Sequence, residues 1–183
     1  GVQIVFDNQV ILGTRARKTR TKSFNAFSSI DYPETAMFRD RRLIQFLQRP
    51  AEYTHAVFST ALDPNVFVLR LVPGMRADII PMLEGRYRAL VLESFGVGGL
   101  PGGDDGAMFA AVRDWCGAGH LAVFTTQVPH EGSDLAVYEV GRAAKALPGV
   151  LEAHDMTPEA TAVKLMWVLG QTADRAEAEK LFL

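Results

Sequence analysis

The chain has 183 residues, of which 48% are hydrophobic and 22% charged, which suits one globular domain or one domain with part of another. Its formal net charge of −2 does not favour a nucleic acid or an anionic membrane surface as a partner. Because no run of about 18 apolar residues occurs, we predict no membrane-spanning helix.

The N-terminal part of the chain predicts short strands and turns. The stretches "VQIVF" and "VILG" flank the turn residues 7–9, which is the pattern of a β-hairpin. The basic stretch "TRARKTRTK" follows, and then "FNAFSSIDYPE", whose Ser, Asp and Pro residues predict irregular chain. We interpret residues 36–55 as a linker with one short apolar piece. Because the chain starts inside a predicted strand, without a Met or a signal peptide, we expect it to be a piece of a longer protein.

From residue 66 onward, apolar stretches alternate with helical patterns. The predicted strands are 66–71, 88–94, 120–126 and 150–153, and the predicted helices are 75–85, 104–119, 137–147, 157–170 and 173–183. Thr157 is the candidate N-cap of its helix, with Pro158 in the first helical position. Strands without period-two alternation, separated by helices, predict an α/β fold of three layers, with a parallel sheet between flanking helices. The carboxyl ends of its strands should meet at one edge, which carries residues 92–105 and 125–135.

A glycine-rich stretch, "LESFGVGGLPGGDD" (92–105), follows one predicted strand. Glycine lets a backbone turn tightly and lets another molecule approach it closely. Gly96 and Gly98 fit the start of the dinucleotide fingerprint, but Pro101 stands where the last glycine belongs. The acids at 104–105 would also repel a pyrophosphate at the N-terminus of the next helix. We therefore favour either a plain tight turn or a loop that presents its backbone to a small polar ligand or to another subunit.

The basic stretch offers one candidate for proton transfer. Lys18 lies among Arg15, Arg17, Arg20 and Lys22, with no aromatic residue interleaved as in single-strand nucleic-acid binding. One interpretation is a solvated strand edge whose charges discourage further pairing. The other is an inward-pointing lysine that assists proton transfer.

The remaining reactive side chains predict no metal or cofactor. The histidines show no i, i+4 pair, and a single cysteine allows no CxxC spacing, so a zinc site is not predicted. Cys116 cannot form an intramolecular disulfide, which is typical of a reducing cytoplasm. We interpret it as a buried structural thiol.

Six blocks of sequence, taken together, resemble a known enzyme family. They are, in chain order, "GTRARKT", "FNAFSSIDYP", "VLESFGVGGLP", "VFTTQ", "DLAVYEVG" and "HDMTPEATAVKLMWVLG". From about residue 4 to residue 182, the chain is similar to the C-terminal portion of cytoplasmic, bacterial-type (type I) L-asparaginases. The resemblance implies two α/β domains per subunit, assembled as a homodimer or homotetramer. It also implies hydrolysis of L-asparagine to L-aspartate and ammonia, without metal or cofactor.

The resemblance implies a threonine nucleophile that these residues do not include. In the family, a threonine hydroxyl attacks the side-chain amide and forms an acyl-enzyme. The two threonine motifs of the family, T-G-G-T and T-D-T, are absent from this sequence. Lys18 matches the lysine of the family's Thr-Lys-Asp proton relay. We therefore expect Lys18 to be catalytic and the chain alone to be inactive, with the nucleophile supplied by an N-terminal part.

The glycine-rich stretch has an implied role at the subunit interface. In the family, this loop of one subunit reaches the active site of its neighbour, which assigns substrate contact to Gly98 and Gly99. Family members often carry Asn where Gly99 stands, so a backbone group or a water would replace that side chain. Some type I enzymes also bind asparagine as an effector, at positions that match Glu93, Ser94, Thr126 and Gln127. This sequence departs from one pattern of that effector site, because Glu93 stands where the pattern has Arg and Val128 where it has Cys.

Two further functions stay open. The chain could be a dimerisation or effector-binding module without chemistry, or it could belong to a related amidohydrolase such as a glutaminase. For domain organisation, we expect residues 1–35 to be a remnant of the N-terminal catalytic domain, 36–55 a linker and 56–183 the C-terminal α/β domain.

Overall fold

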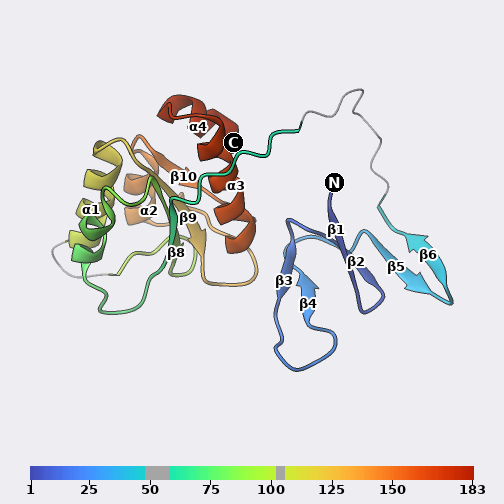
Figure 1. Cartoon of the computed structure of the whole chain (residues 1–183). Coiled ribbons are helices and arrows are strands. Elements are labelled where there is room, and N and C mark those ends of the chain that lie inside the picture. The colour runs from blue at the N-terminus through green and yellow to red at the C-terminus, as the bar shows by residue number, and fades with distance from the viewer. Residues whose placement is uncertain (48–57, 102–105) are drawn as a thin grey trace. The chain divides into compact units, whose positions relative to one another are not determined.

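The computed structural model of the chain describes residues 1–47, 58–101 and 106–183. The chain divides into two compact units, Gly1–Ser59 and Thr60–Leu183, each with its own internal contacts. Figure 1 shows the antiparallel strands of the first unit and the helix-flanked sheet of the second.

Two antiparallel hairpins form the larger sheet of the first unit. Strands β1 (Gln3–Phe6) and β2 (Gln9–Leu12) make the predicted hairpin, whose turn places Asp7 and Asn8 at positive φ. Such a turn suits Asp and Asn, which tolerate the left-handed region better than most residues. Strand β5 (Ala36–Arg39) pairs with β2 and, through a second tight turn, with β6 (Arg42–Gln45).

The second hairpin differs from the expectation of a linker over residues 36–55. Residues 36–45 are instead part of the sheet, with Met37 opposite Ile44 and Phe38 opposite Leu43. Cross-strand apolar pairs of this kind stabilise a hairpin. Its turn uses Asp40 and residue 41 at positive φ, and lacks the glycine that usually announces a hairpin. Residues 48–55 of the expected linker lie outside the described residues.

A second correction concerns the stretch expected to be irregular. Its residues Phe27–Ser29 form strand β4, which pairs antiparallel with β3 (Ala16–Lys18). The pairing fixes the position of Lys18 directly opposite Phe27. The first half of the basic stretch, up to Lys18, therefore lies on a short two-stranded ribbon.

The second unit confirms the predicted parallel α/β fold. Its sheet contains β7 (Val66–Arg70), β8 (Ala89–Ser94), β9 (Leu121–Thr126) and β10 (Val150–Glu152), all parallel and in the order β10-β9-β8-β7. The helices are α1 (Ala107–Gly117), α2 (Glu139–Lys145), α3 (Pro158–Gln171) and α4 (Arg175–Phe182). The α3 N-terminus is built as predicted, because the Thr157 hydroxyl accepts a hydrogen bond from the Ala160 amide at 3.2 Å and Pro158 is the first helical residue.

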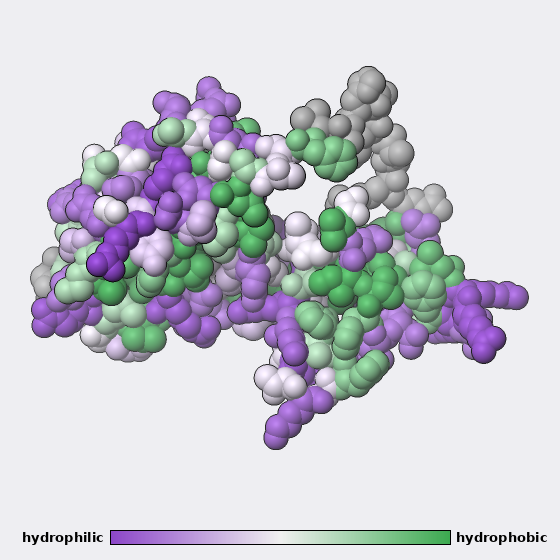
Figure 2. Space-filling model, in the orientation of Figure 1, coloured by the Kyte–Doolittle hydropathy of each residue, from purple (hydrophilic) through white to green (hydrophobic). Residues whose placement is uncertain are grey.

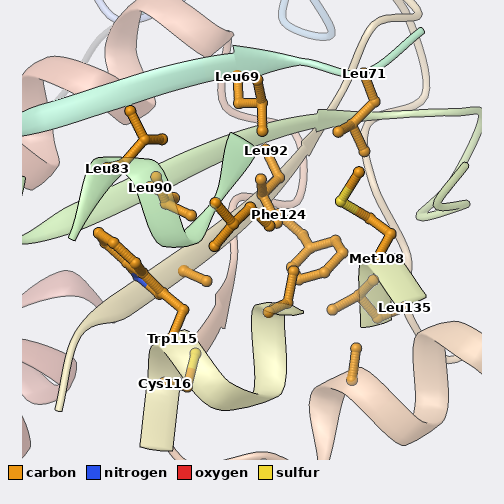
Figure 3. Close-up of a cluster of buried hydrophobic side chains, with 14 residues drawn as sticks. Leu69, Leu71, Leu83, Leu90, Leu92, Met108, Trp115, Cys116, Phe124 and Leu135 are labelled. Atoms are coloured by element: carbon orange, nitrogen blue, oxygen red, sulfur yellow. The ribbon is translucent and has the colours of Figure 1, made fainter. Parts of the chain in front are cut away.

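Each face of the sheet packs against a different set of helices. Leu90, Leu92 and Phe124 point to the face covered by α1 and α2, where they meet Met108 and Trp115 (Figure 3). The alternate residues of β8 and β9 pack against α3 and α4 on the other face. Burying one such side chain contributes about 1.5–3 kcal/mol, so a sheet apolar on both faces has to be covered on both.

The strand order has a consequence for ligand binding. Because the four strands follow one another in chain order, right-handed crossovers place all three connections on one face of the sheet. Many open α/β sheets bind ligands in a crevice where the strand order reverses. The order of these four strands contains no such reversal.

Two predicted helices differ in the structure. Residues 75–85 form two short 3-10 turns, η1 (Ala77–Ile79) and η2 (Pro81–Leu83), because Pro81 has no amide to continue an α-helix. Helix α1 begins after Gly106, and the acids expected in its first turn, at 104–105, lie outside the described residues. In the part of the chain that is described, no helix has the length and hydropathy required to cross a bilayer.

The first unit exposes several large hydrophobic side chains. Figure 2 shows hydrophobic residues on the visible face of its strands. More than half of the surface of each of these side chains is exposed: Val2, Val5, Phe24, Leu43 and Phe46. Apolar surface of this kind is typical of a face that contacts another part of a protein or another molecule.

Candidate functional site

Six of the seven predicted site residues come together at the carboxyl edge of the parallel sheet. Glu93 and Ser94 end strand β8, Thr126 ends β9, and Gln127 follows it. The register places Ser94 beside Thr126. Gly98 and Gly99 lie in the loop that leaves β8 at the same edge, so parallel pairing explains why residues distant in sequence meet here.

The side chain of Gln127 ties the ends of two strands together. Its Nε2 donates hydrogen bonds to the carbonyls of Leu71, at 2.6 Å, and Glu93, at 2.8 Å. Its backbone amide donates to the Ser94 carbonyl at 3.2 Å. Both amide protons of this side chain are therefore used to hold the ends of β7 and β8.

Two hydroxyl groups hold the start of the glycine-rich loop. The Ser94 hydroxyl is fully buried and donates to the Thr125 carbonyl at 2.7 Å. The Thr126 hydroxyl donates to the Gly96 carbonyl at 2.5 Å and accepts from the Val128 amide at 3.0 Å. These contacts give Ser94 and Thr126 a clear structural role at the base of the loop.

The loop itself is a compact turn closed by backbone hydrogen bonds. The Phe95 amide donates to the Gly99 carbonyl at 2.9 Å, and the amides of Gly98 and Gly99 both donate to the Phe95 carbonyl, at 3.1 and 2.7 Å. A Cβ at Gly99 would lie 3.2 Å from the Phe95 carbonyl oxygen. A ligand that uses either glycine amide has to share it with this carbonyl.

The Glu93 carboxylate lies beside an arginine and a buried hydroxyl. Glu93 Oε2 is 3.4 Å from Arg70 Nη1, and the carboxylate is nearly buried while the arginine is mostly exposed. Thr125, directly opposite Glu93 in the sheet, has a buried hydroxyl without a hydrogen-bond partner among the described residues. The edge therefore carries a paired negative charge, with Arg70 on the neighbouring strand.

Lys18, the seventh predicted site residue, belongs to the first unit. It is the last residue of β3 and its side chain is exposed. Within its own unit, an open groove of about 700 Å³ is lined by neighbours of the two-stranded ribbon, including Arg20, Phe27 and Ser28, but not by Lys18. The structure thus brings together the six residues of the second unit and leaves Lys18 on a separate strand ribbon.

Sequence reasoning missed Arg70, Thr125, Leu135 and Glu152, which adjoin the carboxyl edge. Glu152 offered a signal, because a charged residue at the end of a buried apolar strand is unusual. Leu135 gave none, since its importance depends on a contact with Gly98 that only the folded chain creates.

Cys116 is buried, as predicted. Burial raises the pKa of its thiol to about 11, so the thiol is protonated at neutral pH and is not a candidate nucleophile. Among the residues that the structure describes, no three His, Cys, Asp or Glu side chains gather in a way that could hold a metal ion.

The described chain thus combines a helix-covered parallel sheet, which has a glycine turn at its carboxyl edge, with a separate unit of antiparallel hairpins. Comparisons with known proteins identify the family that has these two parts. Residues 65–182 match the Glutaminase/Asparaginase C-terminal domain, and residues 1–52 match the N-terminal Asparaginase domain. The chain belongs to the asparaginase family, as the sequence resemblance predicts.

Individual relatives agree with this family. The L-asparaginase of Thermococcus kodakarensis is 38% identical over 182 residues, which cover 99% of this chain and 54% of the relative. A glutamyl-tRNA(Gln) amidotransferase subunit of Metallosphaera sedula is 32% identical over 177 residues, 93% of this chain and 39% of the relative. The chain thus spans about half the length, or less, of these curated relatives.

Solved structures show the same fold. The thermostable L-asparaginase from Thermococcus kodakarensis superposes with a TM-score of 0.92 at 36% identity, over 100% of this chain and 55% of that one. L-asparaginase I from Vibrio cholerae superposes with a TM-score of 0.83 over 99% of this chain and 54% of that one. At 24% identity, the second comparison concerns the fold alone.

Proposed function

We propose that this chain forms part of an L-asparaginase that hydrolyses the side-chain amide of L-asparagine to L-aspartate and ammonia. The observation that carries the proposal is the match to an L-asparaginase over 99% of the chain, at 38% identity. Support also comes from the glycine turn, which lies at the carboxyl edge of the parallel sheet.

In this proposal Lys18 acts in proton transfer. A threonine hydroxyl attacks the amide carbon, ammonia leaves, and water then hydrolyses the acyl-enzyme. An amine beside that hydroxyl lowers its effective pKa or carries its proton. The threonine motifs are absent from these 183 residues, so the nucleophile has to come from another segment.

The glycine-rich loop completes the site of a neighbouring subunit in this proposal. Gly98 and Gly99 supply backbone groups, or hold a water, where many family members use an Asn side chain. A site shared between subunits requires a homodimer or a homotetramer. The compact hydrogen-bonded turn supports this role, since a preorganised loop loses little conformational freedom when it meets its partner.

We favour a role of the edge in binding substrate over a role in binding an effector. Binding of asparagine as an effector would engage Glu93, Ser94, Thr126 and Gln127. The last three already use their side-chain donor groups in hydrogen bonds that hold the strand ends and the loop. The dimerisation or effector-binding module therefore remains the second proposal, and we propose a cytoplasmic location with either.

A related amide is the other alternative. The similarity to a glutamyl-tRNA(Gln) amidotransferase subunit, at 32% identity, favours glutamine or an amide carried by a larger substrate as the competing choice. L-Asparagine comes first because the asparaginase match is stronger in identity and covers more of the chain.

A chimeric enzyme tests the proposal. Its N-terminal segment is the part of the Thermococcus kodakarensis L-asparaginase that precedes the matched region, and the present chain follows it. We expect ammonia release from L-asparagine, and a loss of about 100-fold or more in kcat for Lys18→Ala, the range typical of general acid–base groups. Lys22→Ala, in the same basic stretch, is the matched control and should retain activity. A folded chimera that releases ammonia only from L-glutamine, or from neither amide, would overturn the proposal.

A further inference from the structure

The segment Ser133–Leu135 forms hydrogen bonds both to the glycine-rich loop and to residues at the end of strand β10. Its three successive backbone amides donate to three different places. Ser133 donates to the His154 carbonyl at 2.9 Å, and Asp134 to the Val97 carbonyl, inside the loop, at 2.8 Å. Leu135 donates to Oε1 of the Glu152 side chain at 2.6 Å. The segment is therefore bound on one side to the loop and on the other to β10.

The Leu135 side chain packs against the glycine-rich loop at Gly98. Its side chain is 1% exposed, and it lies so close to Gly98 that a Cβ there would be 2.6 Å from Leu135 Cδ2. On its other side, a Cβ at Gly141 of helix α2 would lie 2.5 Å from the Leu135 carbonyl oxygen. Leu135 is therefore tightly packed between Gly98 and Gly141, so we expect a shift of its backbone to disturb the packing at Gly98.

Glu152 fixes the backbone of Leu135. The Glu152 side chain is 5% exposed, and its Oε2 is 3.0 Å from Lys145 Nζ on α2. The His154 Nδ1 atom lies 3.8 Å from the same oxygen. A buried carboxylate that accepts from a backbone amide and faces a cation makes a strong, directional contact. Removal of the carboxylate would leave the Leu135 amide buried without its acceptor.

We infer that Glu152 is a positioning residue for the glycine-rich loop and acts through Leu135. Glu152 holds the Leu135 amide, Leu135 supports Gly98, and the adjacent Asp134 amide holds Val97, so one carboxylate sets the conformation of the turn. The effect of Glu152 on catalysis rests on the proposed function, in which this turn contacts the active site of a neighbouring subunit. The effect of Glu152 on the conformation of the loop depends only on the contacts described above.

Amide hydrogen exchange in the isotope-labelled chain tests the structural step without any substrate. Glu152→Ala should speed exchange at Gly98, Gly99 and Asp134 by about tenfold or more, the loss expected for a hydrogen bond to a charged group. The amides of Val91 and Val123, inside the sheet, should keep their rates. Glu152→Gln retains the shape and an acceptor oxygen, so it should restore most of the protection.

Lys145→Ala is the matched control, since it removes the cation and leaves the carboxylate in place. Because half of the Lys145 side chain is exposed, water can replace its ammonium group, so exchange at the loop amides should rise less than in Glu152→Ala. If the loop amides of Glu152→Ala exchange as slowly as those of the unsubstituted chain, the inference is overturned. Equal acceleration of loop and sheet amides in both Glu152 variants would overturn it as well, because the effect would then be global.

The catalytic consequence is measured in the chimeric enzyme described above. Glu152→Ala should raise KM for L-asparagine several-fold and leave kcat within about twofold, because the loop contributes binding rather than the reacting groups. A fall in kcat at constant KM would contradict the link to the loop. If the unsubstituted chimera lacks asparaginase activity, the proposed function fails, while the exchange rates still decide the role of Glu152.

Discussion

Single backbone positions explain much of the geometry at the carboxyl edge. Gly132 has a φ of +70°, and a Cβ placed on it would overlap the His154 carbonyl oxygen. That oxygen also accepts the Ser133 amide, so it cannot move away without breaking a hydrogen bond. The sequence shows a glycine at this position, but only the fold shows the carbonyl that requires it.

The first prediction follows from this close contact. Gly132→Ala should destabilise the chain by about 2 kcal/mol or more, since it adds backbone strain to a steric clash. Gly117→Ala is the control: Gly117 ends helix α1, and nothing lies within 4 Å of an added Cβ. That change should be neutral or stabilise by up to about 1 kcal/mol. Urea unfolding of both variants gives the comparison, and equal midpoints would contradict the prediction.

The second prediction concerns the pH dependence of stability. The pKa of the buried Cys116 thiol is raised from 9.0 to about 11, with desolvation as the main cause. Between these values the unfolded chain loses the proton and the folded chain keeps it, so this residue's contribution to stability is full below pH 9 and is lost as pH rises toward 11. The free energy of unfolding of the unsubstituted chain, minus that of Cys116→Ala, should therefore fall over this range. A constant difference would contradict the assigned burial.

At the scale of elements, the sequence predicts those that are long and apolar. The strands of the second unit were predictable because they are rich in apolar residues, and the two central strands, β8 and β9, are buried along their whole length. The hairpin at 36–45 was not, because its strands are short and mostly exposed and its turn has Asp40 instead of glycine. The 3-10 turns were mistaken for a helix because their apolar spacing is helical, although Pro81 interrupts it.

The third prediction tests the start of helix α3, which covers one face of the sheet. Thr157→Ala removes the hydroxyl that accepts the Ala160 amide and should cost about 1 kcal/mol. Thr157→Ser keeps the oxygen and should recover most of that loss, which separates capping from packing. Thermal unfolding followed by circular dichroism measures both, and an alanine variant as stable as the serine variant would exclude the cap as a source of stability.

The candidate site was only partly predictable, because the sequence pattern indicates where strands end but not which distant groups their side chains contact. The positions of Glu93, Ser94, Thr126 and Gln127 follow from strand ends that meet at one edge. The direction of their hydrogen bonds does not, since Gln127 reaches a carbonyl 56 residues away, at Leu71. The Glu152–Leu135 contact likewise depends on how the segment after β9 folds back over β10.

At the scale of the whole molecule, we propose that catalytic roles are divided between two units. Lys18 lies in Gly1–Ser59, while the glycine-rich loop and its supports lie in Thr60–Leu183. The 183 residues contain neither threonine motif of the family. The central claim is therefore that this chain supplies a relay lysine and an interfacial loop to an asparaginase site without supplying the attacking hydroxyl.

Ammonia release from L-asparagine by the purified chain of 183 residues tests that claim most directly. We predict a rate indistinguishable from the buffer blank, in a preparation whose circular dichroism shows the folded α/β unit. A rate above the blank that is abolished by a substitution within the chain, for example Thr125→Val, would show that a nucleophile is present after all and would contradict the claim.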